Sequence, residues 1–384
     1  MIKRDAAEYI TKLSQWFYVV SLTGPRQSGK STLLRNIFSD YNYINLEHLQ
    51  IRKEAIEDPV GFIRNRPDHL IIDEAQYAPD LFSMIQVAAD ERATTGQYIL
   101  SGSQDFLLSK RIGQSLAGRA GIATLLPLSF KEALSAHKLL TPEEFAYRGG
   151  YPRLYDIDIP VSTYFSSYMR TYLQRDISDY LDVRKVSTFR KFIQMCALRV
   201  GSLLNLTSLA NSCEISFKTA QSWISMLEAS GIIFLLRPFT ENLNKRLVKT
   251  PKLYFSDTGL LCYLLNIRSV QELTVHSLHG VIFENLVIAE RLKRYINLGE
   301  EPRLSFYRDD SKREIDLLDF TTKRFEAIEI KSSQTYNASY ARHLLKVGDQ
   351  LGIPKDCRSV VLRIDHAYQA NGINVVPLCN ELTQ

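Results

Sequence analysis

The segment 24–31 is the sequence feature that most constrains the fold of this chain. It reads Gly-Pro-Arg-Gln-Ser-Gly-Lys-Ser and fits the phosphate-binding pattern G-x-x-x-x-G-K-[ST]. The apolar run 16–20 comes just before it, as expected when such a loop follows a buried strand. Gly24 and Gly29 let backbone N–H groups surround a phosphate, and the helix that follows directs the positive end of its dipole toward it. The pattern therefore predicts a nucleoside triphosphate site. A chance glycine turn is the alternative, which the preceding strand disfavours.

The polar residues of this loop have predicted roles. Lys30 is expected to reach the β- and γ-phosphates, and the Ser31 hydroxyl is expected to bind Mg²⁺. Arg26 is a further positive group, although most residues at variable loop positions face solvent. ATP and Mg²⁺ are therefore the expected cofactors. The predicted nucleotide-binding residues are Gly24, Pro25, Arg26, Gln27, Ser28, Gly29, Lys30, Ser31 and Thr32.

A pair of carboxylates follows a later apolar run. Strand-like and helix-like segments alternate after the loop, which is typical of a parallel α/β sheet. The expected strands are 43–45, 70–72 and 98–100, and the expected helices are 58–66 and 80–93. Asp73 and Glu74 end the second of these strands. Asp73 is expected to hold the metal shell and Glu74 to polarise the attacking water. A surface Asp-Glu pair is the alternative.

Ser103 and Arg119 are two further candidates for catalysis. Ser103 follows the third expected strand among small polar residues, where the γ-phosphate would lie. Arg119 stands between glycines, and it could stabilise transition-state charge in its own subunit or in a neighbour's. A surface arginine in a salt bridge is an equally open interpretation of Arg119.

Composition indicates a globular chain of several domains. Its 384 residues suggest two or three domains of roughly 150 residues each. Five scattered cysteines indicate neither a disulfide framework nor a zinc site. No apolar stretch approaches the roughly 18 residues that cross a bilayer, and the first residues lack a signal-peptide core, so a cytosolic protein without a membrane partner is expected. The net charge of +5 permits a nucleic-acid partner without requiring one.

Several motifs accompany the phosphate-binding loop. They are Ile-Asp-Glu-Ala-Gln at 72–76, Leu-Ser-Gly-Ser-Gln at 100–104, Leu-Ala-Gly-Arg at 116–119 and Leu-Pro-Leu-Ser-Phe-Lys-Glu at 126–132. Together they resemble AAA-type ATPases of prokaryotes, and more narrowly the group whose C-terminal half is a domain of unknown function. Residues 148–152 and 171–177 are similar to that group's domain junction. The resemblance implies an ATPase core at 1–140 and a helical linker or lid at 141–185.

Residues 186–268 are predicted to form a winged-helix module. The expected helices are 189–200, one opening at 206 with Thr207 or Ser208 as cap, and one capped by Ser216 that stops at Gly231; the expected strands are 232–236 and 253–255. The third helix offers Lys218 but also Glu228, which is weak for a reader of the DNA major groove. Asn244, Lys245, Arg246, Lys249 and Lys252 cluster at the hairpin tip, where a wing could touch phosphates. A role as an interdomain packing unit is the alternative.

The C-terminal part, residues 269–384, contains Glu329-Ile330-Lys331. In a strand, Glu329 and Lys331 share a face because side chains alternate. Asp316 lies on a neighbouring strand-like run, and Glu284 lies in an amphipathic helical stretch. The arrangement resembles the PD-(D/E)xK nuclease superfamily, which implies Glu284, Asp316 and Glu329 as metal ligands and Lys331 as the catalytic lysine. Ile315 stands where the motif's name has proline. A cross-face salt bridge is the alternative.

These predictions combine into one fold and one function. The expected fold is α/β, with a P-loop NTPase core of AAA type, a mostly helical winged-helix module and a C-terminal α/β domain that is PD-(D/E)xK-like. The expected function is ATP binding and hydrolysis coupled to a nucleic-acid-binding, Mg²⁺-dependent nuclease domain, with DNA as the expected partner. The alternative is an ATP-dependent regulatory or scaffold protein whose inert nuclease-like domain docks proteins. Oligomeric state, substrate form and biological role stay open.

Overall fold

The computed structural model describes residues 2–66, 69–102, 116–173, 186–239 and 249–384. These residues form two compact units. The first unit contains Met1–Pro127 together with the short segments Ala229–Gly231 and Ile296–Gly299, and the second contains the rest. Ser103 and three residues of the expected hairpin tip, 244–246, lie outside the described residues, as do residues 174–177 of the junction motif.

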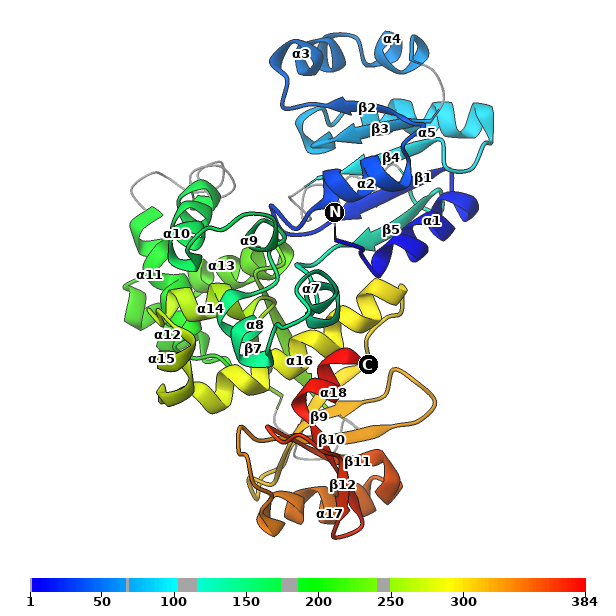
Figure 1. Cartoon of the computed structure of the whole chain (residues 1–384). Coiled ribbons are helices and arrows are strands. Elements are labelled where there is room, and N and C mark those ends of the chain that lie inside the picture. The colour runs from blue at the N-terminus through cyan, green and yellow to red at the C-terminus, as the bar shows by residue number, and fades with distance from the viewer. Residues whose placement is uncertain (1, 67–68, 103–115, 174–185, 240–248) are drawn as a thin grey trace. The chain divides into compact units, whose positions relative to one another are not determined.

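The first unit contains a five-stranded sheet in the order β2-β3-β4-β1-β5 (Figure 1). All neighbouring strands in it are parallel. The strands are β1 (Val19–Thr23), β2 (Asn42–Asn45), β3 (Leu70–Asp73), β4 (Tyr98–Ser101) and β5 (Ala120–Thr124). The expected parallel α/β sheet is thus present, and its three expected strands correspond to β2, β3 and β4.

Helices cover both faces of this sheet. They are α1 (Ala6–Trp16), α2 (Lys30–Ile37), α3 (Leu49–Glu57), α4 (Pro59–Arg64) and α5 (Leu81–Arg92), with the short helix η1 (Ala75–Tyr77). Because side chains alternate along a strand, β3 contributes to two cores. Ile71 packs in the core with α1 and α2, whereas Leu70 and Ile72 pack in the core with α4 and α5. A strand buried on both faces is why residues 70–72 are uniformly apolar.

The second unit contains ten helices before β8 (Leu304–Arg308) among the residues that the structure describes. These are α7 (Phe130–Ala136), α8 (Pro142–Arg148), α9 (Arg153–Asp156), α10 (Val161–Tyr172), α11 (Val186–Ala197), α12 (Leu206–Cys213), α13 (Phe217–Ala229), α14 (Thr258–Leu264), α15 (Val270–Val275) and α16 (His279–Leu298). Ser216 caps α13, since its hydroxyl accepts a hydrogen bond from Thr219 N at 3.1 Å. The cap of α12 is Asn205 rather than Thr207 or Ser208, because the Asn205 side-chain oxygen Oδ1 accepts a hydrogen bond from Ser208 N at 2.9 Å.

An eight-stranded mixed sheet forms the core of the second unit, in the order β12-β13-β11-β10-β9-β8-β6-β7. Its strands are β6 (Ile233–Pro238), β7 (Lys252–Phe255), β8 (Leu304–Arg308), β9 (Glu314–Asp319), β10 (Glu326–Ile330), β11 (Arg358–Leu362), β12 (Tyr368–Ala370) and β13 (Ile373–Pro377). The helices α17 (Ala341–Gln350) and α18 (Leu378–Thr383) follow β10 and β13, as Figure 1 shows.

The expected hairpin is part of this larger sheet. Strands β6 and β7 pair in antiparallel fashion, as expected, but β6 also pairs in parallel with β8 through Arg237 and Ser305. The expected boundary between residues 268 and 269 therefore crosses one continuous sheet. Local sequence could not show this, because β8 is some fifty residues farther along the chain than β7.

The division between the two units falls at Pro127 and Leu128, earlier than the expected boundary at residue 140. Leu128 N donates a hydrogen bond to Gly150 O at 2.6 Å, and Phe130 N donates to Glu290 at 2.7 Å. These bonds join the start of α7 to the second unit. Within the described residues, no helix combines the length and apolarity needed to cross a bilayer.

Candidate functional site

The loop 24–31 leaves the carboxyl end of β1, and α2 begins at Lys30. Gly24 has φ +140°, and a Cβ atom there would lie 2.2 Å from Leu125 O. Gly29 has φ +95° and precedes the first turn of α2. Both positions require glycine, because a side chain would be strained or would collide with the backbone. The local geometry is therefore that of a glycine-bounded loop that leads directly into a helix N-terminus, which is a favourable place for an anion.

Lys30 is buried against its own loop. Its ammonium donates hydrogen bonds to Gly24 O and Pro25 O, each at 2.8 Å. The Ser28 hydroxyl in the same loop is buried without a hydrogen-bond partner. Arg26 lies 4.0 Å from Glu47 in an ion pair. The loop thus concentrates positive charge and hydrogen-bond donors at one end of the sheet, which suits a polyphosphate.

Arg4 supports this loop, and sequence analysis did not identify it. The side chain is buried, and its guanidinium donates to Ser28 O at 2.8 Å and to Leu126 O at 2.6 Å. It therefore ties the loop to the segment that follows β5. Its role depends on contacts far apart in the chain, so no local motif could have revealed it.

Asp73 lies at the carboxyl end of β3, at the same sheet edge as the loop. In register, Ser101 of β4 faces both Leu22 of β1 and Asp73 of β3. The Asp73 carboxylate accepts hydrogen bonds from the Ser101 hydroxyl and, at 2.5 Å, from the Tyr43 hydroxyl. In open parallel sheets, ligands bind beyond these carboxyl ends.

Tyr43 connects the two residues expected to bind Mg²⁺ in the first unit. Its hydroxyl interacts with the Ser31 hydroxyl as well as with Asp73, and burial together with Asp73 raises the pKa of Tyr43 well above its ordinary value. Ser31 and Asp73 are both oxygen donors, which suit Mg²⁺, and the rest of the metal's shell would come from nucleotide and water. The residues present therefore fit a magnesium-bound nucleotide, and Tyr43 is a member of the site that sequence analysis missed.

Glu74 follows Asp73 in a left-handed backbone conformation, with φ 56°. Burial raises the pKa of Glu74, while a hydrogen bond from Gln76 and the charge of Lys30 oppose that rise. Gln76 Nε2 donates to Glu74 Oε2 at 2.5 Å. The acidic pair follows the carboxyl end of β3 and the loop follows the carboxyl end of β1, so both lie at the same edge of the sheet.

Arg119 lies at the other end of the sheet. Its backbone oxygen accepts from Val19 N at the start of β1, whereas the loop leaves the end of that strand. A five-residue strand at about 3.3 Å per residue separates the two by about 16 Å. The guanidinium forms an ion pair with Asp90 at 2.5 Å. Within its own chain, Arg119 forms a salt bridge, as the alternative interpretation expected. Stabilisation of transition-state charge in a neighbouring subunit stays a prediction.

In the second unit, the four residues expected from the nuclease resemblance lie together. Lys331 Nζ is 3.0 Å from Asp316 Oδ2 on β9 and 2.7 Å from Glu329 Oε1 on β10. Burial raises the pKa of Glu329 and of Glu284 on α16, and the charge of Asp316 raises both further. We call these four residues, with Lys252 and Glu314, the acidic cluster.

Lys252 is placed differently from the sequence prediction. It was expected at an exposed wing tip, but its side chain is only 4% exposed. Its ammonium lies 3.2 Å from Glu284 and 2.6 Å from Glu314. Tyr254, two residues on in β7, donates to the same Glu284 carboxylate. Lys252 and Tyr254 share a strand face, so an aromatic residue two positions away was the signal that could have indicated a buried position for the Lys252 side chain.

The acidic cluster supplies carboxylates, which Mg²⁺ prefers, and Glu329 Oε2 is buried without a hydrogen-bond partner. However, across the described residues no three His, Cys, Asp or Glu side chains lie close enough together to hold a metal ion. Lys252 and Lys331 pair with the carboxylates instead. In this arrangement the acidic cluster does not form a metal-binding site. The metal-ligand roles of Glu284, Asp316 and Glu329 stay predictions.

Family models match three consecutive parts of the chain. Residues 17–134 match a family described as an AAA domain. Residues 141–271 and 279–380 match two families described as domains of unknown function, DUF8612 and DUF4143. The first unit is therefore a P-loop domain of the AAA ATPase type, as its sheet, loop and acidic pair indicate.

Relatives and solved structures share long stretches with the chain. An uncharacterized protein of Mycobacterium tuberculosis is 29% identical over 353 residues, which cover 91% of this chain and 78% of the relative. One of Haemophilus influenzae is 23% identical, with 77% and 79% covered. The Walker-type ATPase of Pyrococcus abyssi matches with TM-score 0.45 and 15% identity, covering 68% of this chain and 95% of its own. A Holliday junction branch migration motor of Thermotoga maritima matches with TM-score 0.29 and 18% identity, covering 62% and 90%.

Proposed function

We propose that the first unit binds ATP with Mg²⁺ and hydrolyses it. The observation that carries the proposal is the position of the loop 24–31, Asp73 and Glu74 at one edge of the parallel sheet. Phosphoryl transfer needs donors that hold the phosphates and a carboxylate that orients water. The loop supplies the donors, and Glu74 supplies the carboxylate.

The chain's own groups divide the work as follows. Lys30 exchanges its bonds to Gly24 O and Pro25 O for phosphate oxygens when the triphosphate enters. Tyr43 and Ser101 hold Asp73 in place through hydrogen bonds. Glu74, near the Lys30 charge, accepts a hydrogen bond from the attacking water. Ser31 and Asp73 are the residues that would hold Mg²⁺, and the bound ion would neutralise charge on the phosphates.

Phosphate release from Mg²⁺-ATP tests this function. We expect Lys30→Ala to abolish ATP binding and turnover, because the ammonium is the main fixed charge on the phosphates. Lys12→Ala is the matched control, since Lys12 is an exposed lysine on α1. Equal rates for wild type and Lys30→Ala would contradict the proposal.

A second candidate is cleavage of nucleic acid, with DNA as the expected substrate, by the second unit. The observation in its favour is the convergence of Glu284, Asp316, Glu329 and Lys331, in the order and on the elements that the nuclease resemblance implies. The α11–α13 helices and the β6–β7 pair would supply DNA contacts as a winged helix. Lys218 on α13 and Lys249 are exposed and available for phosphates.

The competing hypothesis is a regulatory or scaffold protein whose acidic cluster is inert. It is favoured by the ion pairs that Lys252 and Lys331 make with the carboxylates. Incubation with Mg²⁺, ATP and a panel of labelled DNA and RNA separates the two. Cleavage that is lost in Lys331→Ala supports the nuclease. No cleavage by the wild type, or cleavage unchanged in Lys331→Ala, supports the inert domain.

A further inference from the structure

A cavity of about 600 Å³ opens in the second unit, apart from the acidic cluster. It lies among the loop after α7, helix α8, the start of α10 and the start of α15. Its lining residues are His137, Lys138, Leu139, Leu140, Glu144, Tyr147, Arg148, Val161 and Val270. Pockets that bind small molecules have volumes of about 300–1,000 Å³, so this cavity has room for one.

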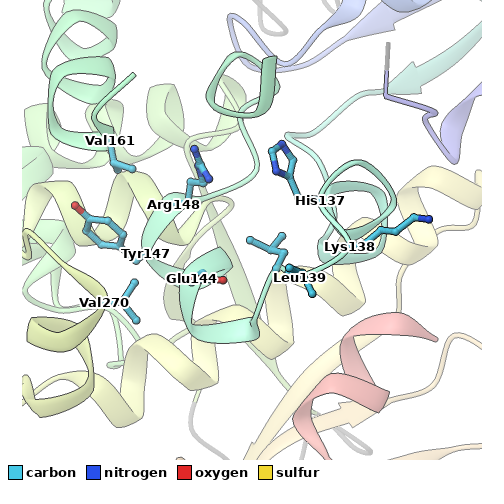
Figure 2. A pocket seen from close by; sticks show the side chains of 9 residues that line it. His137, Lys138, Leu139, Glu144, Tyr147, Arg148, Val161 and Val270 are labelled. Carbon is cyan, nitrogen blue, oxygen red and sulfur yellow. The ribbon is translucent and has the colours of Figure 1, made fainter. Parts of the chain in front are cut away.

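The lining combines an apolar wall with basic side chains. Figure 2 shows Tyr147, Val161 and Val270 on one side and His137 and Leu139 on the other, with Arg148 between them. Apolar walls that carry a few convergent polar groups are typical of ligand sites, because the walls supply affinity and the polar groups fix orientation.

Arg148 is the basic residue that most requires an acceptor. Its guanidinium lies over the Tyr155 ring, 5.3 Å from the centroid. Its Nε atom is buried and has no hydrogen-bond partner. Within the described part of the chain, no carboxylate pairs with this guanidinium. Buried donors in folded proteins are almost always satisfied, so the missing acceptor is a feature that needs an explanation.

The polar neighbours of Arg148 are already engaged elsewhere. Glu144, the acid in the lining, accepts a hydrogen bond from Thr141 N at 3.0 Å as part of a capping box. The Tyr147 hydroxyl donates to Arg268 O at 2.5 Å. His137 Nε2 lies 3.2 Å from Tyr155 O. Arg148 and Lys138 carry two positive charges against the one negative charge of Glu144, so the net charge of the lining is positive.

We propose that this cavity binds a small organic anion with an apolar body. The anionic group, a carboxylate for example, accepts hydrogen bonds from Arg148, whose planar guanidinium matches such groups. The apolar body lies against Leu139, Val161 and Val270. Leu139 is 93% exposed, and burial of its side chain beneath the ligand adds a hydrophobic contribution.

Calorimetric titration of the full chain with 1-naphthoate tests the proposal, and 1-naphthamide is the uncharged analogue of the same shape. We expect one site for the naphthoate and about tenfold weaker binding of the amide. Arg148→Met should weaken naphthoate binding about tenfold and leave amide binding unchanged. Arg342→Met, an exposed arginine on α17, is the matched control and should change neither affinity.

A second variant avoids any dependence on the folding of Arg148→Met. Leu139→Asp adds a negative charge at the cavity on a side chain that is outside the core, so the fold should be kept while naphthoate binding is lost. The proposal is overturned if naphthoate does not bind at about 1 mM, if both analogues bind equally, or if neither variant changes the naphthoate affinity. None of these results depends on ATP hydrolysis.

Discussion

The Lys252 ammonium lies 2.6 Å from Glu314 Oε1 and connects β7 to β9 of the same sheet. It also lies 3.2 Å from Glu284 on α16. A lysine that is almost fully buried must be paired, because an isolated charge in the interior is strongly disfavoured. Lys252 therefore holds two strands of this sheet and helix α16 together through charge.

We predict that Lys252→Met destabilises the second unit by about 3–5 kcal/mol, because it leaves the Glu284 carboxylate buried without its cation, whereas Glu314 still pairs with Arg308. Urea unfolding measures the change, with Trp223 as the probe. The sequence has two tryptophans, Trp16 and Trp223. The parent and all variants therefore carry Trp16→Phe, which leaves Trp223, buried in α13, as the single fluorescent reporter. Lys249→Met, an exposed lysine nearby, should unfold like the parent.

A double variant checks the cause of that effect. If the lost charge pair is responsible, adding Glu284→Gln to Lys252→Met should recover part of the stability, because one orphaned charge is removed. Equal unfolding of Lys252→Met and the parent would contradict the buried position of Lys252.

The stability of the second unit should depend on the charge of Glu329. Burial raises the pKa of Glu329 above its ordinary 4.5, and the charge of Asp316 raises it further. The folded chain then holds this proton more tightly than the unfolded chain. The stabilisation that this bound proton gives the folded chain is complete below pH 4.5, and it is lost as the pH rises through the raised pKa of Glu329.

We therefore expect the free energy of unfolding to fall from about pH 5 to about pH 8, by about 1.4 kcal/mol for each unit of raised pKa. Glu329→Gln, which is neutral at every pH, should flatten this dependence. The Trp223 probe measures both curves. Parallel curves for Glu329→Gln and the parent would refute the assignment.

Sequence analysis located the strands, the loop and the acidic pair where the signal was contiguous, while the catalytic roles of these residues stay predictions. The loop 24–31 and the pair Asp73-Glu74 each occupy one short segment after an apolar run, so residue type and order sufficed. Its errors concern contacts between distant segments. Lys252 was placed on a wing because the pairing of β6 with β8 is not visible locally. Arg4 gave no signal, since its acceptors are 24 and 122 residues away.

Arg4 offers a test of the loop's support. Arg4→Ala removes two hydrogen bonds to backbone oxygens and should raise the Kd for ATP about tenfold, because the loop loses its fixed position. Lys3→Ala, at an exposed neighbouring position, is the control and should bind ATP like the wild type. Fluorescent nucleotide titration gives both constants. An unchanged Kd for Arg4→Ala would show that the loop needs no such support.

Arg119→Ala should leave ATP hydrolysis unchanged in dilute solution, because Arg119 lies at the far end of the sheet from Lys30 and pairs with Asp90. Rates measured over a range of protein concentrations check this expectation. A loss of activity that grows with concentration would assign Arg119 to a neighbouring subunit's site, whereas an equal loss at every concentration would contradict its position.

The most direct measurement combines ATP binding and ATP turnover in Glu74→Gln. Glu74 orients water but does not hold the phosphates, so calorimetry should give an ATP affinity within about twofold of the wild type. Phosphate release should fall by about 100-fold or more, because the general base is lost. If the wild type takes up neither adenine nor guanine nucleotides, or if Glu74→Gln hydrolyses ATP at the wild-type rate, the nucleotide site is not formed by these residues.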